Sequence, residues 1–192
     1  MLLLGVLQAQ AAGGVAVATD FDLLEQRVLD TAESSVTFSS LSTYAADYQH
    51  LQLRIMARTT RNSTNDHLKF TFNGASSTAG WHSLYGNGSS VASTGAGNQP
   101  PIFAVFSIAA ATTTADVFSP AVVDILDAFE TTKFKTYRSF SGMASNANMV
   151  SLGSGYWPST NAISSIKIEN ANEPSNLVTG SRFSLYGIKA GA

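Results

Sequence analysis

The sequence predicts an all-β protein, a jelly-roll-type antiparallel β-sandwich with an apolar N-terminal arm. Three observations lead to this fold class. Apolar and polar residues alternate with a period of two in many short segments, turn residues separate these segments, and no stretch after the arm keeps a helical period over three turns. The 192 residues suit one such domain, because a chain of this length buries a sizeable core without metals or crosslinks.

The arm comes first, at residues 1–20, and a single β-sandwich domain is expected at residues 21–192. Five apolar side chains define the arm, and they are Leu2, Leu3, Leu4, Val6 and Leu7. The first acidic residue along the chain is Asp20. An exposed apolar run is costly in a free monomer, so we expect the arm to bury these side chains against another subunit or another protein.

A cleaved secretory signal is the alternative interpretation of the N-terminal run. Ala9-Gln10-Ala11 resembles a cleavage site, but no Lys or Arg occurs before Arg27 and the apolar core spans only about six residues. A membrane-spanning helix needs about 20 apolar residues, so we expect none here.

Period-2 alternation then predicts a series of strands. It is clearest at 50–56, where Leu51, Leu53 and Ile55 share a face, and at 68–72. Similar patterns predict strands at 35–39, 102–108, 121–129, 134–140, 150–157 and 163–169, with turns at Asn73-Gly74, Gly86-Asn87-Gly88, Gly142 and 170–176. The segment 121–129 is also compatible with a short helix, and its β-branched start favours the strand.

The C-terminal segment predicts one more strand, built into the sheet with little room for a tail. Phe183, Leu185 and Gly187 alternate there with Arg182, Ser184, Tyr186 and Ile188. We therefore expect Phe183 and Leu185 to be core residues.

A Gly- and Ser-rich segment at 86–99, followed by Pro100-Pro101, is expected to be a surface loop. Trp81, His82 and Tyr85 lie in or beside it. Flat aromatic faces next to polar groups are what a carbohydrate platform needs, so these three residues are the candidate glycan contact. The alternative is that the aromatic rings fill the core or rim of the sandwich.

Composition argues against several function classes. A net charge of −2 with 12% charged residues does not supply the broad basic face that duplex DNA requires, so no nucleic-acid partner is expected. Zero cysteines exclude disulfides and thiolate zinc sites. The absence of a G-x-S-x-G elbow, and histidines that we interpret as solvated strand residues, predict no catalytic site, no metal and no cofactor. We therefore do not expect an enzyme, nor a membrane partner.

Nine motifs in order, from about Ser34 to Lys189, resemble a family of small virion proteins of tailed bacteriophages. The chain departs from the family pattern at 44–49, which leaves the start of the following strand open. The motifs are Ser34-Ser35-Val36-Thr37-Phe38-Ser39, His50-Leu51-Gln52-Leu53-Arg54, Phe72-Asn73-Gly74, Trp81-His82-Ser83-Leu84-Tyr85-Gly86-Asn87-Gly88-Ser89, Val123-Asp124-Ile125-Leu126-Asp127, Lys135-Thr136-Tyr137-Arg138-Ser139, Gly155-Tyr156-Trp157, Ile163-Ser164-Ser165-Ile166 and Gly180-Ser181-Arg182-Phe183-Ser184-Leu185-Tyr186-Gly187-Ile188-Lys189.

The resemblance implies a non-enzymatic component of the phage particle. Three roles stay open: a tail-associated fibre or receptor-recognition module that contacts host surface glycans, a capsid decoration protein, and a secreted carbohydrate-binding module or glycan-active enzyme with the first dozen residues cleaved. For the first two we expect the arm to contact other virion proteins and the chain to form a homo-oligomer, with a homotrimer as the favoured number.

Overall fold

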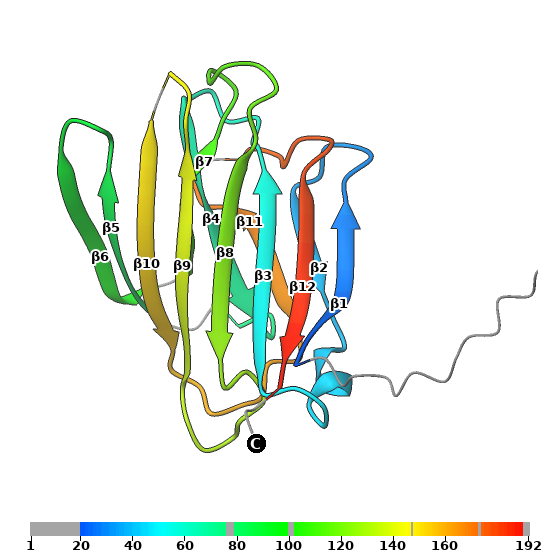
Figure 1. Ribbon diagram of the computed structural model, residues 1–192. Coiled ribbons are helices and arrows are strands. Elements are labelled where there is room, and N and C mark those ends of the chain that lie inside the picture. Colours follow the sequence, from blue (N-terminus) through cyan, green and yellow to red (C-terminus); the bar gives the residue numbers. More distant parts are fainter. Residues whose placement is uncertain (1–19, 76–78, 100–101, 147, 173, 190–192) are drawn as a thin grey trace, which may run out of the picture.

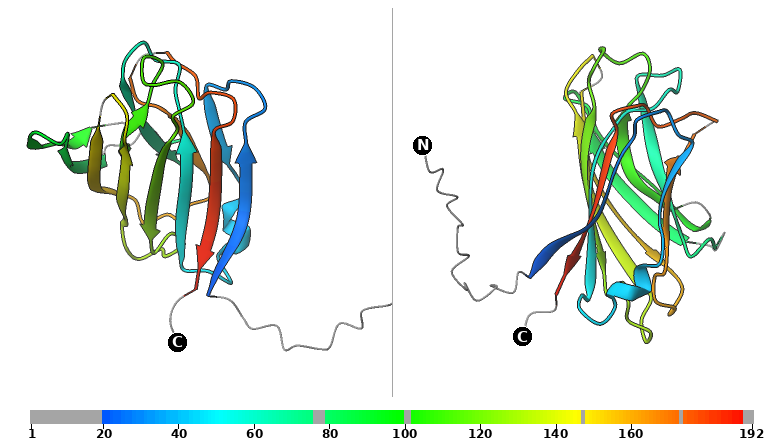
Figure 2. Two further views of the ribbon diagram at one scale, coloured as in Figure 1. Left: turned by 45° about the horizontal axis from the view of Figure 1, so that its top comes forward. Right: turned by 90° about the vertical axis from the view of Figure 1, so that its right-hand side faces the viewer.

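The computed structural model describes residues 20–75, 79–99, 102–146, 148–172 and 174–189, whose regular secondary structure is β-strand apart from one short 3₁₀ helix. Two antiparallel sheets lie face to face, one large and one small (Figures 1 and 2). The predicted all-β sandwich of jelly-roll type is confirmed. The arm residues Leu2, Leu3, Leu4, Val6 and Leu7 lie outside the described residues.

The large sheet has eight strands in the order β1-β12-β3-β8-β9-β10-β5-β6. Their bounds are β1 Phe21–Val28, β12 Arg182–Ile188, β3 His50–Ala57, β8 Ser119–Leu126, β9 Lys135–Met143, β10 Met149–Trp157, β5 Ala79–Gly86 and β6 Val91–Gln99. The small sheet has the order β2-β11-β4-β7, with β2 Ser35–Phe38, β11 Ile166–Asn170, β4 Asn65–Phe72 and β7 Ile102–Ala109.

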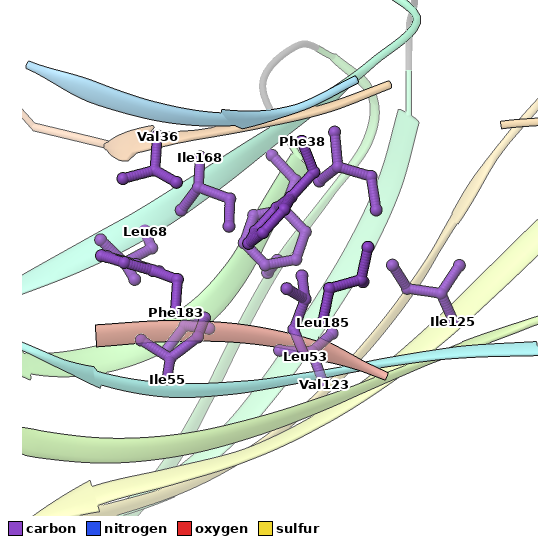
Figure 3. Packing of buried hydrophobic residues seen from close by; sticks show 14 of the residues in the cluster. Val36, Phe38, Leu53, Ile55, Leu68, Val123, Ile125, Ile168, Phe183 and Leu185 are labelled. Atoms are coloured by element: carbon purple, nitrogen blue, oxygen red, sulfur yellow. The ribbon is translucent and has the colours of Figure 1, made fainter. Parts of the chain in front are cut away.

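The core lies between the two sheets, where apolar side chains from both layers meet (Figure 3). Leu53, Val123 and Phe183 come from the large sheet, and Phe38 and Leu68 come from the small sheet; all five are fully buried. The period-2 alternation of each strand explains this arrangement, because every second side chain points to the same face. Phe183 and Leu185 are both 0% exposed, which confirms their predicted core positions.

The C-terminal strand β12 lies inside the large sheet. It pairs with β1 on one side and with β3 on the other, in registers that match Phe183 with Arg27 and with Ile55. The first and the twelfth strand of the described chain are therefore neighbours, and β12 connects the edge strand β1 to the rest of the sheet.

Several predicted boundaries were wrong. The expected loop at 86–99 is a hairpin: Asn87 accepts hydrogen bonds from the backbone of Ser89 and Ser90, and β6 follows from Val91. β8 ends at Leu126, since Asp127 adopts a left-handed conformation with φ 50°. β11 begins at Ile166, three residues later than predicted.

The residues that depart from the family pattern, 44–49, begin at the last residue of a short 3₁₀ helix, Leu41–Tyr44. β3 then begins at His50. β1, at the edge of the large sheet, had not been predicted as a separate strand. Its partly exposed side chains do not alternate cleanly, and its register with β12 shifts between Leu23 and Glu25.

Candidate interaction surface

The outer face of the large sheet, which faces the viewer in Figure 1, carries a row of exposed apolar side chains. The row runs across β8, β9, β10 and β5, because Val122 pairs with Phe140, Phe140 with Leu152, and Leu152 with Leu84. Directly paired residues of antiparallel strands lie on the same face with their Cβ atoms about 5 Å apart. The four side chains, 36%, 56%, 54% and 46% exposed in that order, therefore form a continuous strip.

Two valines extend this strip towards the hairpin that joins β5 and β6. Val150 on β10 is flanked by Gly142 on β9 and Gly86 on β5, and Gly86 pairs in turn with Val91. The two glycines leave a shallow apolar groove around Val150, which Leu84, Val91 and Phe140 also line. We refer to Leu84, Val91, Val122, Phe140, Val150 and Leu152 as the apolar band.

The inner face beneath the apolar band is lined with serine. Four side chains, Ser83, Ser139, Ser141 and Ser151, are at most 7% exposed. Ser141 and Ser151 both donate to the carbonyl of Phe106 on β7, and their own Oγ atoms are 2.7 Å apart. β7 packs against β9, β10 and β5, so the small serine side chains allow its backbone to approach closely. We refer to these four residues as the inner serines.

This part of the sheet thus reverses the usual pattern. A half-solvated antiparallel strand normally turns its apolar residues to the core and its polar residues to water. On β10, Ser151 points inward while Val150 and Leu152 point outward, and on β5 Ser83 points inward while Leu84 points outward. Core positions on these strands carry serine. The apolar residues of the band are therefore not on the outer face because the core positions were already filled by other apolar residues.

Beside the apolar band the outer face carries polar and charged side chains, several of which interact with one another. Asp124 accepts hydrogen bonds from Gln52 at 2.7 Å and from Arg138 at 2.9 Å. The rings of Phe21 and Tyr186 stack on each other at 4.7 Å, and the guanidinium of Arg54 lies 4.9 Å from each ring centroid. These polar and charged groups lie on β12, β3, β8 and β9, and the same part of the outer face also exposes Val28 on β1 and Met56 on β3.

The structure separates the three candidate glycan-contact residues. All of them lie on β5, not in a loop, and Trp81 and Tyr85 point to the opposite face from His82. His82 is exposed on the outer face, opposite Ser154. The single platform expected from the sequence was wrong for this reason, whereas glycan contact by any one of the three stays a prediction.

Trp81 and Tyr85 join an aromatic cluster around Phe106 on β7. Their ring centroids are 5.7 Å and 5.6 Å from that of Phe106, and the ring of His67 on β4 stacks on Phe106 at 3.9 Å. His67 is not the solvated strand residue expected from the sequence. Burial lowers its pKa to about 4, and the positive charge of Arg61 acts in the same direction, so the ring is neutral near pH 7.

Two further findings concern the part of the chain that the structure describes. It contains no group of three or more His, Cys, Asp or Glu side chains placed to hold a metal ion. No helix in it has the length and apolar character to cross a membrane.

Comparison with protein-family models, with curated proteins and with solved structures found no match for this chain.

The six residues of the apolar band were not recognised in the sequence. Val122, Phe140, Val150 and Leu152 lie in segments that had been predicted as strands, where an apolar residue would normally be assigned to the core. Val91 lies in the predicted surface loop, and no strand had been predicted at Leu84. Ser139, Ser141 and Ser151 were the signal available, because they alternate with Phe140, Val150 and Leu152 and mark the inner face of β9 and β10 as polar.

Proposed function

We propose that this protein is a structural subunit of the virion of a tailed bacteriophage, and that it acts as a tail-associated fibre or receptor-recognition component which assembles as a homo-oligomer. The role is one of assembly and contact, without catalysis. In this proposal the apolar band is an assembly surface, and the arm at residues 1–20 contacts other virion proteins.

The reversed pattern on β5, β9 and β10 is the observation that carries the assembly role. Six partly exposed apolar side chains on one face represent a free-energy cost in water at about 25 cal/mol per Å². The inner serines occupy core positions on the same strands, so packing within the monomer does not explain why the apolar residues face outward. A surface of this kind is typical of a subunit that becomes covered by a partner.

The assignment to a phage particle is supported by the resemblance of the ordered motifs between Ser34 and Lys189. Several of these motifs have a structural explanation here. The motif at 180–189 contains β12 with the core residues Phe183 and Leu185, and Asn73 within Phe72-Asn73-Gly74 accepts hydrogen bonds from the backbone of Ser164 and Ser165.

The test is to identify the protein in purified phage particles. Antibodies raised against the isolated protein should detect it in gradient-purified virions of the phage that encodes it, and immunogold labelling should mark the tail. Labelling across the head with hundreds of copies would favour capsid decoration, and secretion with an N-terminus cleaved near Ala11 would favour a carbohydrate-binding module. Absence from the virion would contradict the proposal.

The arm has its own test within the same experiment. Deleting residues 1–14 should leave a soluble domain that no longer joins the particle, because the deletion removes all five apolar arm residues. Normal incorporation of the truncated chain would contradict the proposed role of the arm and would leave the role of the apolar band open.

A further inference from the structure

The apolar band has the size of a small protein interface. Its six side chains are between 36% and 73% exposed and include one phenylalanine, three valines and two leucines. Together they present on the order of 500 Å² of apolar surface, near the upper end of the largest patch on a typical monomer. No member of the band carries a charge.

We propose that the apolar band is the contact through which a second copy of this chain binds, with the large sheets of the two copies packed face to face around a two-fold axis. This inference rests on the proposed function, because it takes the apolar band as an assembly surface. It adds the identity of the partner, which is a second copy of this chain. Two such bands together bury about 1,000 Å², which reaches the lower end of specific protein interfaces.

The chemistry of the band suits a copy of itself. A two-fold contact places the same patch on both sides, so the patch must be self-complementary. An uncharged strip meets this condition because it brings no like charges together. The charged neighbours of the band are Arg54, which pairs directly with Val122, and Asp124 and Arg138, which neutralise each other through their 2.9 Å contact.

Other modes of association cover this surface less well. A strand added to the free edge of β6 would lie in the plane of the sheet and would leave the outer face exposed. Phe140 lies three strands away from that edge, because the order is β9-β10-β5-β6. A face-to-face contact, with sheets about 10 Å apart, is the geometry that covers Phe140 and Leu152 together.

Sedimentation velocity of the full-length chain over a range of about 1 to 200 µM tests the proposal. We expect wild type to self-associate, and the double variant Phe140→Ser with Leu152→Ser to associate at least a hundredfold more weakly, because the two-fold contact changes four buried side chains at about tenfold each. Phe134→Ser is the matched control, because Phe134 is 53% exposed against 56% for Phe140 but lies outside the band, before β9 begins. The control should associate like wild type, and near-UV circular dichroism should verify that all variants are folded.

Cross-linking provides a second measurement that does not depend on removing apolar side chains. The chain has no cysteine, so a single cysteine can be placed without interference. Ser154→Cys lies on the outer face beside Leu152, and Thr37→Cys lies on the exposed face of β2 in the small sheet. A short bis-maleimide should join two copies through position 154 and should not do so through position 37.

The outcomes separate this inference from the proposed function. A wild-type chain that stays monomeric at 200 µM, or equal association by wild type and the double variant, overturns the inference. Loss of association on deleting residues 2–7, with the double variant unaffected, also overturns it and assigns the contact to the arm. A monomeric protein found in virions would remove this inference and leave the virion role in place, whereas a dimer absent from virions would remove the virion role and leave this inference in place.

Discussion

The ring of Tyr48 lies on the backbone of Gly187, where no larger residue fits. A Cβ atom built on Gly187 would be 2.5 Å from both Cγ and Cδ1 of Tyr48. The Tyr48 hydroxyl continues to β1 and donates to Asp22 at 3.0 Å. One side chain thus covers β12 and contacts β1, and the glycine in the C-terminal motif is explained by this contact.

Replacing Gly187 by Ala should destabilise the domain by about 1–3 kcal/mol, because the added methyl group overpacks against the Tyr48 ring. Chemical denaturation measures the change. Gly97→Ala is the control, since nothing lies within 4 Å of a Cβ at that position. Adding Tyr48→Ala should recover part of the loss caused by Gly187→Ala, and a purely additive double variant would contradict the contact.

Phe183→Ala should cost about 3–5 kcal/mol of folding stability, enough to unfold a marginal domain. The ring is fully buried between the sheets, and the surrounding strands cannot collapse into the space that it leaves. Arg182→Ala, at the exposed neighbouring position, should change stability little. Urea denaturation of both variants decides the matter, and a Phe183→Ala protein as stable as wild type would place β12 outside the core.

Arg58 holds the connection between β7 and β8 by hydrogen bonds to four backbone carbonyls. Its Nη1 atom donates to Thr114 and Val117 at 2.8 Å and 3.0 Å, and its Nη2 atom donates to Ala111 and Thr113 at 3.2 Å and 3.0 Å. Arg58→Lys keeps the charge but loses the planar fork, so we expect a loss of about 1–3 kcal/mol.

The matched substitution for Arg58→Lys is Arg138→Lys, in an ion pair whose arginine is 72% exposed. Exposed pairs contribute about 0–1 kcal/mol, so this variant should stay close to wild type. Thermal unfolding compares the two proteins. If Arg58→Lys stays as close to wild-type stability as Arg138→Lys does, the positive charge at position 58 is sufficient to support the loop and the planar guanidinium is not required.

The pH dependence of stability should show a contribution from His67. Its folded-state pKa of about 4 lies below the usual value of 6.5, so between these values the unfolded chain binds a proton that the folded protein does not. Stability should therefore fall as the pH is lowered from 6.5 towards 4, by on the order of 2–3 kcal/mol from this residue. His67→Asn keeps an acceptor for the backbone amide of Ser107, which bonds to His67 Nδ1 at 3.2 Å. An unchanged pH profile in this variant would exclude the contribution.

Glycan contact can now be tested separately on the two faces of β5. If the aromatic cluster binds host polysaccharide, Trp81→Ala with Tyr85→Ala should abolish binding, and His82→Ala on the outer face should leave it intact. Binding of purified host envelope polysaccharide by folded variants is the measurement. Retained binding by the double variant would reject the cluster, and loss of binding in His82→Ala would move the contact to the outer face.

Much of the fold could be predicted from alternation, because β3, β4 and β12 each bury one face completely. β6 could not, since its small residues such as Ala92, Ser93 and Gly95 show no contrast between a buried and a solvated face. The serines on β9 and β10 could have marked outward-facing apolar residues there, but the continuity of the apolar band across strands could not have been predicted. Val122, Phe140 and Leu152 become neighbours through strand register, and register is a long-range property that no local pattern contains.

The position of β12 between β1 and β3 has a consequence for biosynthesis. Ribosomes deliver β1 more than 150 residues before β12, a delay of on the order of ten seconds at typical elongation rates. During that time β1 has no neighbour in the order of the large sheet, and β3 presents Leu53 and Ile55 at an open edge. A nascent chain that stalls before β12 is therefore a candidate for chaperone capture or proteolysis, and arrival of the twelfth strand is the event that commits the chain to its native sheet.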